Sequence, residues 1–165
     1  MKTLPPLLVA GALVAVGPAA AAAQDVLDVG VHVARATDVL DGSTGIGGQL
    51  AVNLPGFPVT VRGAVDRFFP DCPDDATDDC GAWGFTVDAN LALPVPVLSP
   101  YASAGLVRRS VDFGDPTEPE AAEAGFALGG GVELGLLGLN AFGEARYEIM
   151  DGLDDTWMFR LGLLF

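Results

Sequence analysis

The residues that could carry out covalent chemistry are few. The chain has one histidine, His32, and a histidine base needs a serine or cysteine within hydrogen-bond reach. The serines Ser43, Ser99, Ser103 and Ser110 lie near expected connections or on another segment than His32. A lone histidine without an orienting partner is weak evidence for catalysis. We therefore predict no catalytic residue and no enzyme activity, and we expect His32 to be a hydrogen-bonded structural residue.

Two cysteines enclose an acidic stretch. Cys72 and Cys80 flank the sequence PDDATDD. Cysteines this close together in an exported chain indicate a disulfide across a loop. The alternative is a metal pair, but the spacing matches no zinc pattern and no second cysteine pair exists. The carboxylates also lack the spacing of a calcium loop, so we expect a solvated acidic loop, with weak divalent binding as the alternative.

A glycine-rich stretch, LGGGVELGLLG, could suggest a nucleotide loop. No Lys-Ser or Lys-Thr pair follows it, and a phosphate loop should open a helix. We instead expect Gly129, Gly131 and Gly135 to make room for side chains that share their face of a sheet, or to relieve the curvature of the sheet. No cofactor is predicted.

The first 23 residues have the pattern of a secretory signal peptide. Lys2 precedes an apolar run, and Ala21 and Ala23 form an A-x-A cleavage signal. An uncleaved anchor is the alternative, but Pro5, Pro6 and Pro18 weigh against it. We expect a signal peptide over residues 1–23 and a single mature domain over residues 24–165.

The composition favours an all-β chain. The 165 residues include 22 glycines and 12 prolines, which oppose long helices, although half of the chain is apolar. The longest uncharged stretch after the signal peptide, Ala89 to Val107, contains Pro94, Pro96 and Pro100 and cannot form one membrane helix.

Apolar side chains instead recur at every second position between turn signals, which is typical of strands. Each such segment has about the length that a tilted strand needs to cross a bilayer, roughly 9 to 11 residues plus rims. The predicted segments are Val26 to Asp38, Thr44 to Leu54, Phe57 to Phe69, Gly81 to Leu93, Pro100 to Val111, Ala124 to Leu137, Leu139 to Met150, and Asp155 to Phe165.

The two faces of these segments differ in polarity. One face carries mainly valine, leucine and aromatic residues, and the other carries charged and amide side chains. The fifth segment is ambiguous, because neither of its faces is clearly apolar or clearly polar. On the polar face we expect a network of Asp28, His32, Arg62, Asp66, Asp88, Glu133, Glu144, Arg146, Glu148 and Arg160.

The connections distinguish a membrane barrel from a soluble one. Of the 22 acidic residues, 15 lie at the end where the odd-numbered connections are, and none lies in an even-numbered connection. Longer loops at one end and tight turns at the other are typical of a transmembrane barrel, with the long loops outside and a polar lumen. Because backbone groups must be paired in hydrocarbon, the strands must close, and eight is an allowed even number. We predict an eight-stranded antiparallel up-and-down transmembrane β-barrel.

The mature chain resembles the small outer-membrane β-barrel family of OmpA/OmpX-like eight-stranded barrels. The resemblance rests on the signal peptide, the eight alternating segments, PYASAGLV after a short turn, and the last strand TWMFRLGLLF. It implies an outer-membrane location, and it implies that Phe165 is the assembly signal read by the outer-membrane insertion machinery. No peptidoglycan-binding domain like that of OmpA is recognisable, so that function is not expected here.

An eight-stranded barrel is just wide enough for side chains to fill it, so we expect a plugged lumen and a structural or surface-interaction role. Two alternatives stay open: a small ion-conducting barrel, and a soluble exported lipocalin-like barrel with an apolar ligand. The net charge of −14 becomes −15 when Lys2 leaves with the signal peptide, which makes nucleic acid an implausible partner. The sequence identifies no extracellular partner.

Four arginines are candidates for contact with membrane lipids. Arg35 and Arg67 share the face of the lipid-facing valines, and one of the adjacent Arg108 and Arg109 must also point outward. All lie toward the acidic end, where a cation costs little and the planar guanidinium suits phosphate. We expect contacts with anionic head groups such as those of lipopolysaccharide. The alternative is that these side chains simply snorkel to water.

Overall fold

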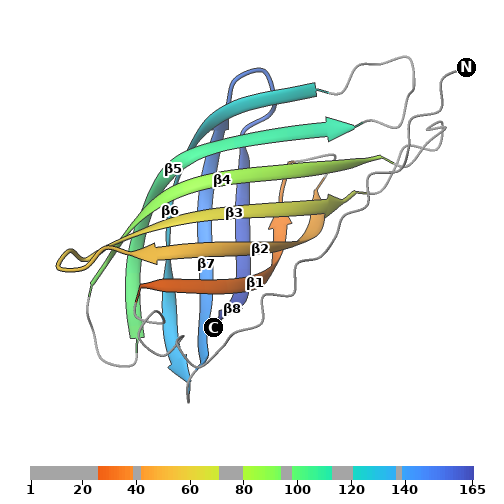
Figure 1. Ribbon diagram of the computed structural model, residues 1–165. Helices are drawn as coiled ribbons and strands as arrows, with labels where there is room; N and C mark the ends of the chain where they lie inside the picture. Colours follow the sequence, from red (N-terminus) through yellow and green to blue (C-terminus); the bar gives the residue numbers. More distant parts are fainter. Residues whose placement is uncertain (1–25, 39–41, 71–79, 94–97, 113–120, 137–138) are drawn as a thin grey trace, which may run out of the picture.

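The computed structural model describes residues 26–38, 42–70, 80–93, 98–112, 121–136 and 139–165. These residues form eight strands in one closed barrel (Figure 1). Among them, no helix is long and apolar enough to cross a membrane. The strands are β1 (Leu27–Ala36), β2 (Ser43–Asn53), β3 (Val59–Phe69), β4 (Gly81–Ala92), β5 (Leu98–Asp112), β6 (Ala121–Leu136), β7 (Leu139–Met150) and β8 (Thr156–Leu164).

Every strand pairs antiparallel with its neighbour in the sequence, and β1 pairs with β8 to close the ring. The β1–β8 ladder runs from Gly30 opposite Leu164 to Ala36 opposite Met158. Phe165 extends this closure, because its N–H donates to the Val29 carbonyl at 2.8 Å and its carbonyl accepts from the Val29 N–H at 3.2 Å. The predicted fold of eight antiparallel strands in an up-and-down barrel is therefore confirmed.

Two strands begin at least two residues earlier than predicted. β5 starts at Leu98 rather than Pro100, and β6 starts at Ala121 rather than Ala124. Pro100 is accommodated near the strand end, where its carbonyl accepts from the Leu93 N–H at 2.9 Å. The first residues of β6 carry no strand signal of their own and are ordered by pairing with the end of β5.

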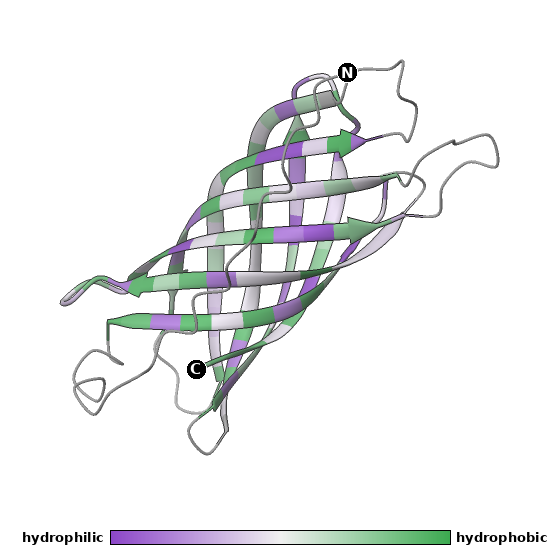
Figure 2. Cartoon of the chain, turned by 45° about the vertical axis from the view of Figure 1, so that its right-hand side comes forward, coloured by the Kyte–Doolittle hydropathy of each residue, from purple (hydrophilic) through white to green (hydrophobic). Residues whose placement is uncertain are grey.

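The barrel is apolar outside and polar inside. Val31 and Leu161 are 53% and 65% exposed, whereas the inward Arg62 is only 2% exposed. Figure 2 shows hydrophobic and hydrophilic residues alternating along the strands. The outward aliphatic and aromatic side chains are called the apolar belt below. β5 follows the same rule, with Arg108 outward and Arg109 inward, which settles the ambiguity of the fifth segment.

The two ends of the barrel differ. At one end, called the acidic end, β1, β3, β5 and β7 finish; at the other, the short-turn end, β2, β4 and β6 finish. The β2–β3 turn contains Gly56 and the β7–β8 turn contains Gly152, with φ of 82° and 87°. These left-handed conformations favour glycine because other residues pay a steric cost there.

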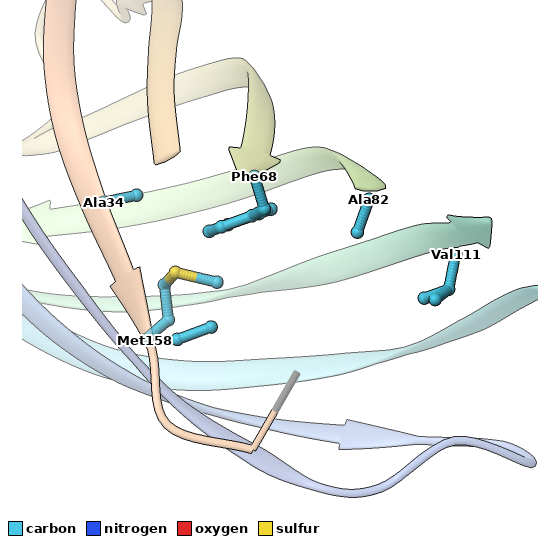
Figure 3. Close-up of a cluster of buried hydrophobic side chains, with 6 residues drawn as sticks. Ala34, Phe68, Ala82, Val111 and Met158 are labelled. Atoms are coloured by element: carbon cyan, nitrogen blue, oxygen red, sulfur yellow. The ribbon is translucent and has the colours of Figure 1, made fainter. Parts of the chain in front are cut away.

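Hydrophobic side chains fill the lumen near the acidic end (Figure 3). The cluster consists of Ala34, Ala36, Phe68, Ala82, Val111 and Met158, with Leu153 packed against it. Phe68 is fully buried and Met158 nearly so. This cluster is called the apolar cap.

Candidate functional site: the charged lumen

The charged side chains of the lumen come from five of the eight strands, and two of the other strands carry small residues on their inward faces. β3, β4, β5, β7 and β8 supply the buried arginines and carboxylates. β2 and β6, which lie opposite each other in the ring, place glycine at many inward positions. A Cβ at Gly129 would collide with Arg146 and with the backbone of β7, and one at Gly131 would collide with the Tyr101 ring. The expectation that Gly129 and Gly131 make room for inward side chains is confirmed. It does not hold for Gly135, where a Cβ would meet only the Asn140 Oδ1 at 3.6 Å.

One ion pair crosses the full width of the barrel. Arg62 of β3 donates to Glu144 of β7, and these strands lie opposite each other in the ring of eight. Tyr101 of β5 donates its hydroxyl to the same carboxylate at 2.9 Å. Arg62 also lies 3.3 Å from Asp88. All of these side chains are nearly inaccessible to solvent, so the pair forms a crossbar through the lumen.

A second group of contacts continues toward the acidic end. Arg146 of β7 donates to Asp88 at 2.9 Å and lies 3.1 Å from Glu148. Arg109 of β5 donates to the other oxygen of Glu148. The two arginines share this carboxylate because both of their side chains point to the barrel axis. Charge-assisted hydrogen bonds of this kind are stronger than hydrogen bonds between neutral groups.

The third group joins β1, β3 and β8. Arg160 donates to Asp66 at 2.5 Å and lies 3.5 Å from Glu144, which links it to the crossbar. His32 Nε2 lies 2.6 Å from the other oxygen of Asp66. The ring of His32 packs edge-on against Phe142 with centroids 6.1 Å apart. His32 thus has a polar partner and an apolar neighbour, both in the barrel interior.

The buried charges of the described residues balance. Four arginines (Arg62, Arg109, Arg146 and Arg160) face four carboxylates (Asp66, Asp88, Glu144 and Glu148), all of them buried. The sequence prediction had placed Arg109 among the candidates for head-group contact. That prediction is wrong, because Arg109 is 1% exposed and is paired with Glu148 inside the barrel. The register of β5 determines which of Arg108 and Arg109 points inward. The sequence did not reveal this register, because neither face of the segment is clearly polar or apolar.

Two predicted members of the network lie apart from its buried core. Asp28 and Glu133 are half-buried and line a cavity of about 50 Å³ at the short-turn end, below Arg62 and Tyr101. Asp28 accepts from the Asn53 amide at 2.9 Å. A cavity of this size holds a few waters at most, at roughly 10–15 Å³ of this measure for each. Asp28 and Glu133 therefore form a polar entrance rather than part of the packed network.

Other predicted sites fall partly or wholly outside the described residues. The signal peptide (1–23) and Cys72 lie outside them, and so does the PDDATDD loop. Cys80 is buried just before β4. The Cys72–Cys80 disulfide stays a prediction, which a thiol count on protein purified from the membrane would test. Among the described residues, no group of three or more His, Cys, Asp or Glu side chains could hold a metal ion.

The outward arginines lie near the acidic end. Arg35 donates to the Thr44 hydroxyl at 2.9 Å, and Arg108 is exposed between β4 and β6. Arg67 is half-buried and stacks on Trp83, with its guanidinium carbon 5.1 Å from the ring centroid. Aromatic residues accompany them on the same end of the apolar belt: Trp83 with Phe85, and Trp157 between Tyr147 and Phe159.

Comparison with known proteins shows likeness in structure only. No protein-family model matches the chain, and no curated protein matches it by sequence. The N-terminal β-barrel domain of OprF from Pseudomonas aeruginosa superposes with a TM-score of 0.68 at 16% identity, covering 84% of this chain and 95% of that one. Neisserial surface protein A (NspA) gives 0.56 at 14% identity, covering 84% and 92%. Ail, the attachment invasion locus protein of Yersinia pestis, gives 0.53 at 16%, covering 85% and 97%.

These three structures are matched over 92% to 97% of their own length. This chain has eight antiparallel strands in one closed sheet, and an even strand number is typical of bacterial outer-membrane barrels. The chain therefore has the fold of the small eight-stranded outer-membrane β-barrels.

Proposed function

We propose that this protein is an integral outer-membrane β-barrel with a closed lumen, whose role is structural or in surface interaction rather than catalytic. The observation that carries the proposal is the inverted burial. Valine, leucine and aromatic side chains are exposed around the barrel, and four arginines with four carboxylates are buried within it. In water this arrangement would leave a large apolar surface exposed, whereas in a bilayer the belt contacts hydrocarbon.

The inverted burial also argues against the soluble alternative. A lipocalin-like carrier needs its apolar face inside, around a cavity for an apolar ligand. Here the interior near the short-turn end is a small polar cavity and the centre is an ion-pair network. These observations favour the membrane barrel over the lipocalin-like alternative.

The dimensions and the rims support a membrane-spanning barrel. The strands are 9 to 16 residues long, which suits strands that cross a bilayer at a tilt of about 45°. Tryptophan and phenylalanine gather in the apolar belt toward the acidic end, and the exposed Phe57 and Phe165 lie at the other end. Aromatic girdles at both interfaces are typical of such barrels. In this orientation the acidic end faces outside and the short-turn end faces the periplasm.

The proposed partners within the membrane are lipids. Arg35, Arg67 and Arg108 point outward at the acidic end, where they would meet anionic head groups such as those of lipopolysaccharide. Replacing all three by glutamine should lower the lipopolysaccharide that co-purifies with a still-folded barrel. Unchanged retention would support simple snorkelling instead. The insertion machinery would read β8 together with Phe165, which follows it.

The extracellular partner would be cationic rather than anionic. Ail from Yersinia pestis has also been solved with sucrose octasulfate, a heparin analogue. In this chain the described part of the outer rim carries a hollow of about 430 Å³ lined by Asp38, Asp154 and Asp155. A polyanion would be repelled there, so we do not extend the binding seen in Ail to this protein.

Fractionation and gel mobility test the proposed function. The full-length chain, expressed in a Gram-negative host, should be recovered in the outer-membrane fraction. Its apparent size should shift on gels between unheated and boiled samples, because a closed barrel resists unfolding by detergent until it is heated. Recovery in the soluble periplasmic fraction, with no shift on heating, would refute the proposal.

A further inference from the structure

The apolar belt is hollowed on one side. One hollow of about 680 Å³ lies over β8, β1, β2 and β3, with Trp83 of β4 at its edge. A second, of the same volume, lies over β1 to β4. The two share Val31, Gly48 and Val65, so they form one continuous depression, called the β1–β3 groove below.

Missing side chains create this groove. Gly48 of β2 and Gly63 of β3 point outward, between neighbours that carry valine, isoleucine or leucine. A Cβ at Gly48 would meet no atom closer than the Gly30 carbonyl oxygen at 3.7 Å, and one at Gly63 only the Thr86 oxygen at 4.0 Å. The backbone is thus bare there without any steric need for glycine, in contrast to the inward glycines that make room for the lumen residues.

The groove has a cation at its acidic end. Arg67 lines the first hollow together with Trp83, and the rest of that lining is almost entirely apolar. Stacking on the indole ring fixes the direction of the guanidinium. In the sheet, Arg67 pairs with Ile46, and Arg35 pairs with Thr44, the next outward residue of β2. Two cations therefore flank β2 at the outer end of a strip that is otherwise aliphatic.

We propose that the β1–β3 groove is a binding site for an outer-leaflet lipid, with one acyl chain along Gly48 and Gly63 and the lipid phosphate at Arg67. This inference rests on the proposed function, because it needs the belt to lie in a membrane. The groove is continuous with the surface that faces hydrocarbon, so its occupant must be apolar over most of its length. The arginine at one end requires an anion there, and a planar guanidinium binds phosphate through two N–H groups.

The same features argue against a second copy of the barrel as the occupant. Another barrel would present its own apolar belt of valine and leucine to this face. Arg67 would then be covered without an anion, and burying a charge without a partner is costly. A phosphorylated lipid satisfies both the apolar floor and the cation.

Tryptophan fluorescence can report on the groove directly. The chain has two tryptophans, Trp83 at the groove and Trp157 on β8. In the Trp157→Phe variant, emission comes from Trp83 alone. This protein would be reconstituted into phosphatidylcholine vesicles with a minor fraction of phosphatidylglycerol, brominated near the carboxyl end of its chains so that it quenches nearby indole. A matched sample would carry the bromine on phosphatidylcholine at the same fraction.

We expect brominated phosphatidylglycerol to quench Trp83 as if enriched about fivefold over its bulk fraction, the size of preference that one arginine near the surface supplies. Brominated phosphatidylcholine should quench in proportion to its bulk fraction. Arg67→Gln should abolish the preference for the anionic lipid. The double variant Gly48→Leu with Gly63→Leu should fill the groove and lower quenching by both lipids.

The matched control is Gly143→Leu. Gly143 also points outward, and a Cβ there would meet only the Leu161 Cδ1 at 3.8 Å, but it does not line the groove. This variant should behave like the parent. Each variant must show the heat-dependent gel shift, which confirms a folded barrel.

The outcomes separate the two claims. Quenching in proportion to bulk lipid for both head groups, or quenching unchanged by filling the groove, would overturn the lipid site while leaving a membrane barrel. Protection of Trp83 from both lipids together with dimers in cross-linking would show a second copy on this face and also overturn it. A soluble protein whose Trp83 no lipid quenches would refute the proposed function itself.

Discussion

Glu144 is the most connected carboxylate of the lumen. It accepts from Arg62 and Tyr101 and lies within 3.7 Å of Arg146 and 3.5 Å of Arg160. A buried charge that loses its partner is strongly destabilising because no water replaces it. Removing this one negative charge therefore affects three arginines at once.

We predict that Glu144→Gln lowers the free energy of unfolding by about 3–5 kcal/mol. The control is Glu133→Gln, the same chemical change at a half-buried inward position beside the short-turn cavity, for which we expect less than about 1 kcal/mol. Urea titration of both variants in lipid vesicles, followed by the heat-dependent gel shift, measures the difference. Equal costs for the two substitutions would show that the crossbar does not stabilise the barrel.

Arg108 and Arg109 are adjacent residues in opposite environments. Arg108 is exposed on the apolar belt, and Arg109 is buried against Glu148 and the Phe68 ring. The sequence predicted that one of them points outward but could not say which. The small residues alanine, serine and glycine occupy both faces of the N-terminal half of β5. Only the pairing with β4 and β6 fixes the register.

This pair gives a second prediction. Arg109→Gln should cost about 3 kcal/mol of stability, because Glu148 then keeps only Arg146 as a partner, while Arg108→Gln should change stability by less than about 0.5 kcal/mol. The same unfolding measurement applies to both. A larger cost for Arg108→Gln would mean that β5 has the opposite register.

At the scale of the elements, the strands could be predicted well from the sequence and their packing could not. Period-two alternation located all eight strands, since a membrane barrel needs opposite polarity on its two faces throughout. The early starts of β5 and β6 escaped prediction, because pairing with a neighbour extends strands beyond their own alternating residues. The partners of each lumen charge also escaped it, since Arg62 and Glu144 are 82 residues apart.

β2 and β6 have a distinct function in this packing. Their inward glycines give space to long side chains from the other strands, and Gly129 is the cross-strand partner of Arg146. On the outer face of β2, Gly48 has open space instead. The same residue type therefore serves opposite purposes on the two faces, and alternation alone does not separate them.

A pair of alanine substitutions tests this distinction. Gly129→Ala should destabilise the barrel by about 1–3 kcal/mol, the usual cost of overpacking, because the added methyl group meets the β7 backbone and Arg146. Gly48→Ala adds the same group on the outer face and should be neutral or slightly stabilising. Refolding yield and urea midpoint in vesicles would measure both. Similar losses in the two variants would contradict the packing role of β6.

For the whole molecule, the lumen has three layers along its axis. The short-turn end has the polar cavity of about 50 Å³, the centre has the balanced ion-pair network, and the acidic end has the apolar cap of Phe68, Met158 and their neighbours. The sequence predicted a plugged, charged lumen. It did not predict the cap, because inward apolar residues near the end of a strand interrupt the polar face without a periodic signal of their own.

These layers lead to the last prediction, that the barrel is closed to solutes. The crossbar of Arg62 and Glu144 spans the ring, and the apolar cap covers the network above it. Liposomes containing the purified protein should therefore show no swelling in isotonic sugars, while a 16-stranded porin reconstituted alongside swells readily. Because the two barriers are in series, Arg62→Ala with Glu144→Ala should leave the vesicles tight unless Phe68→Ala is added. Size-dependent sugar uptake by the unmodified protein would refute closure and favour the small conducting barrel.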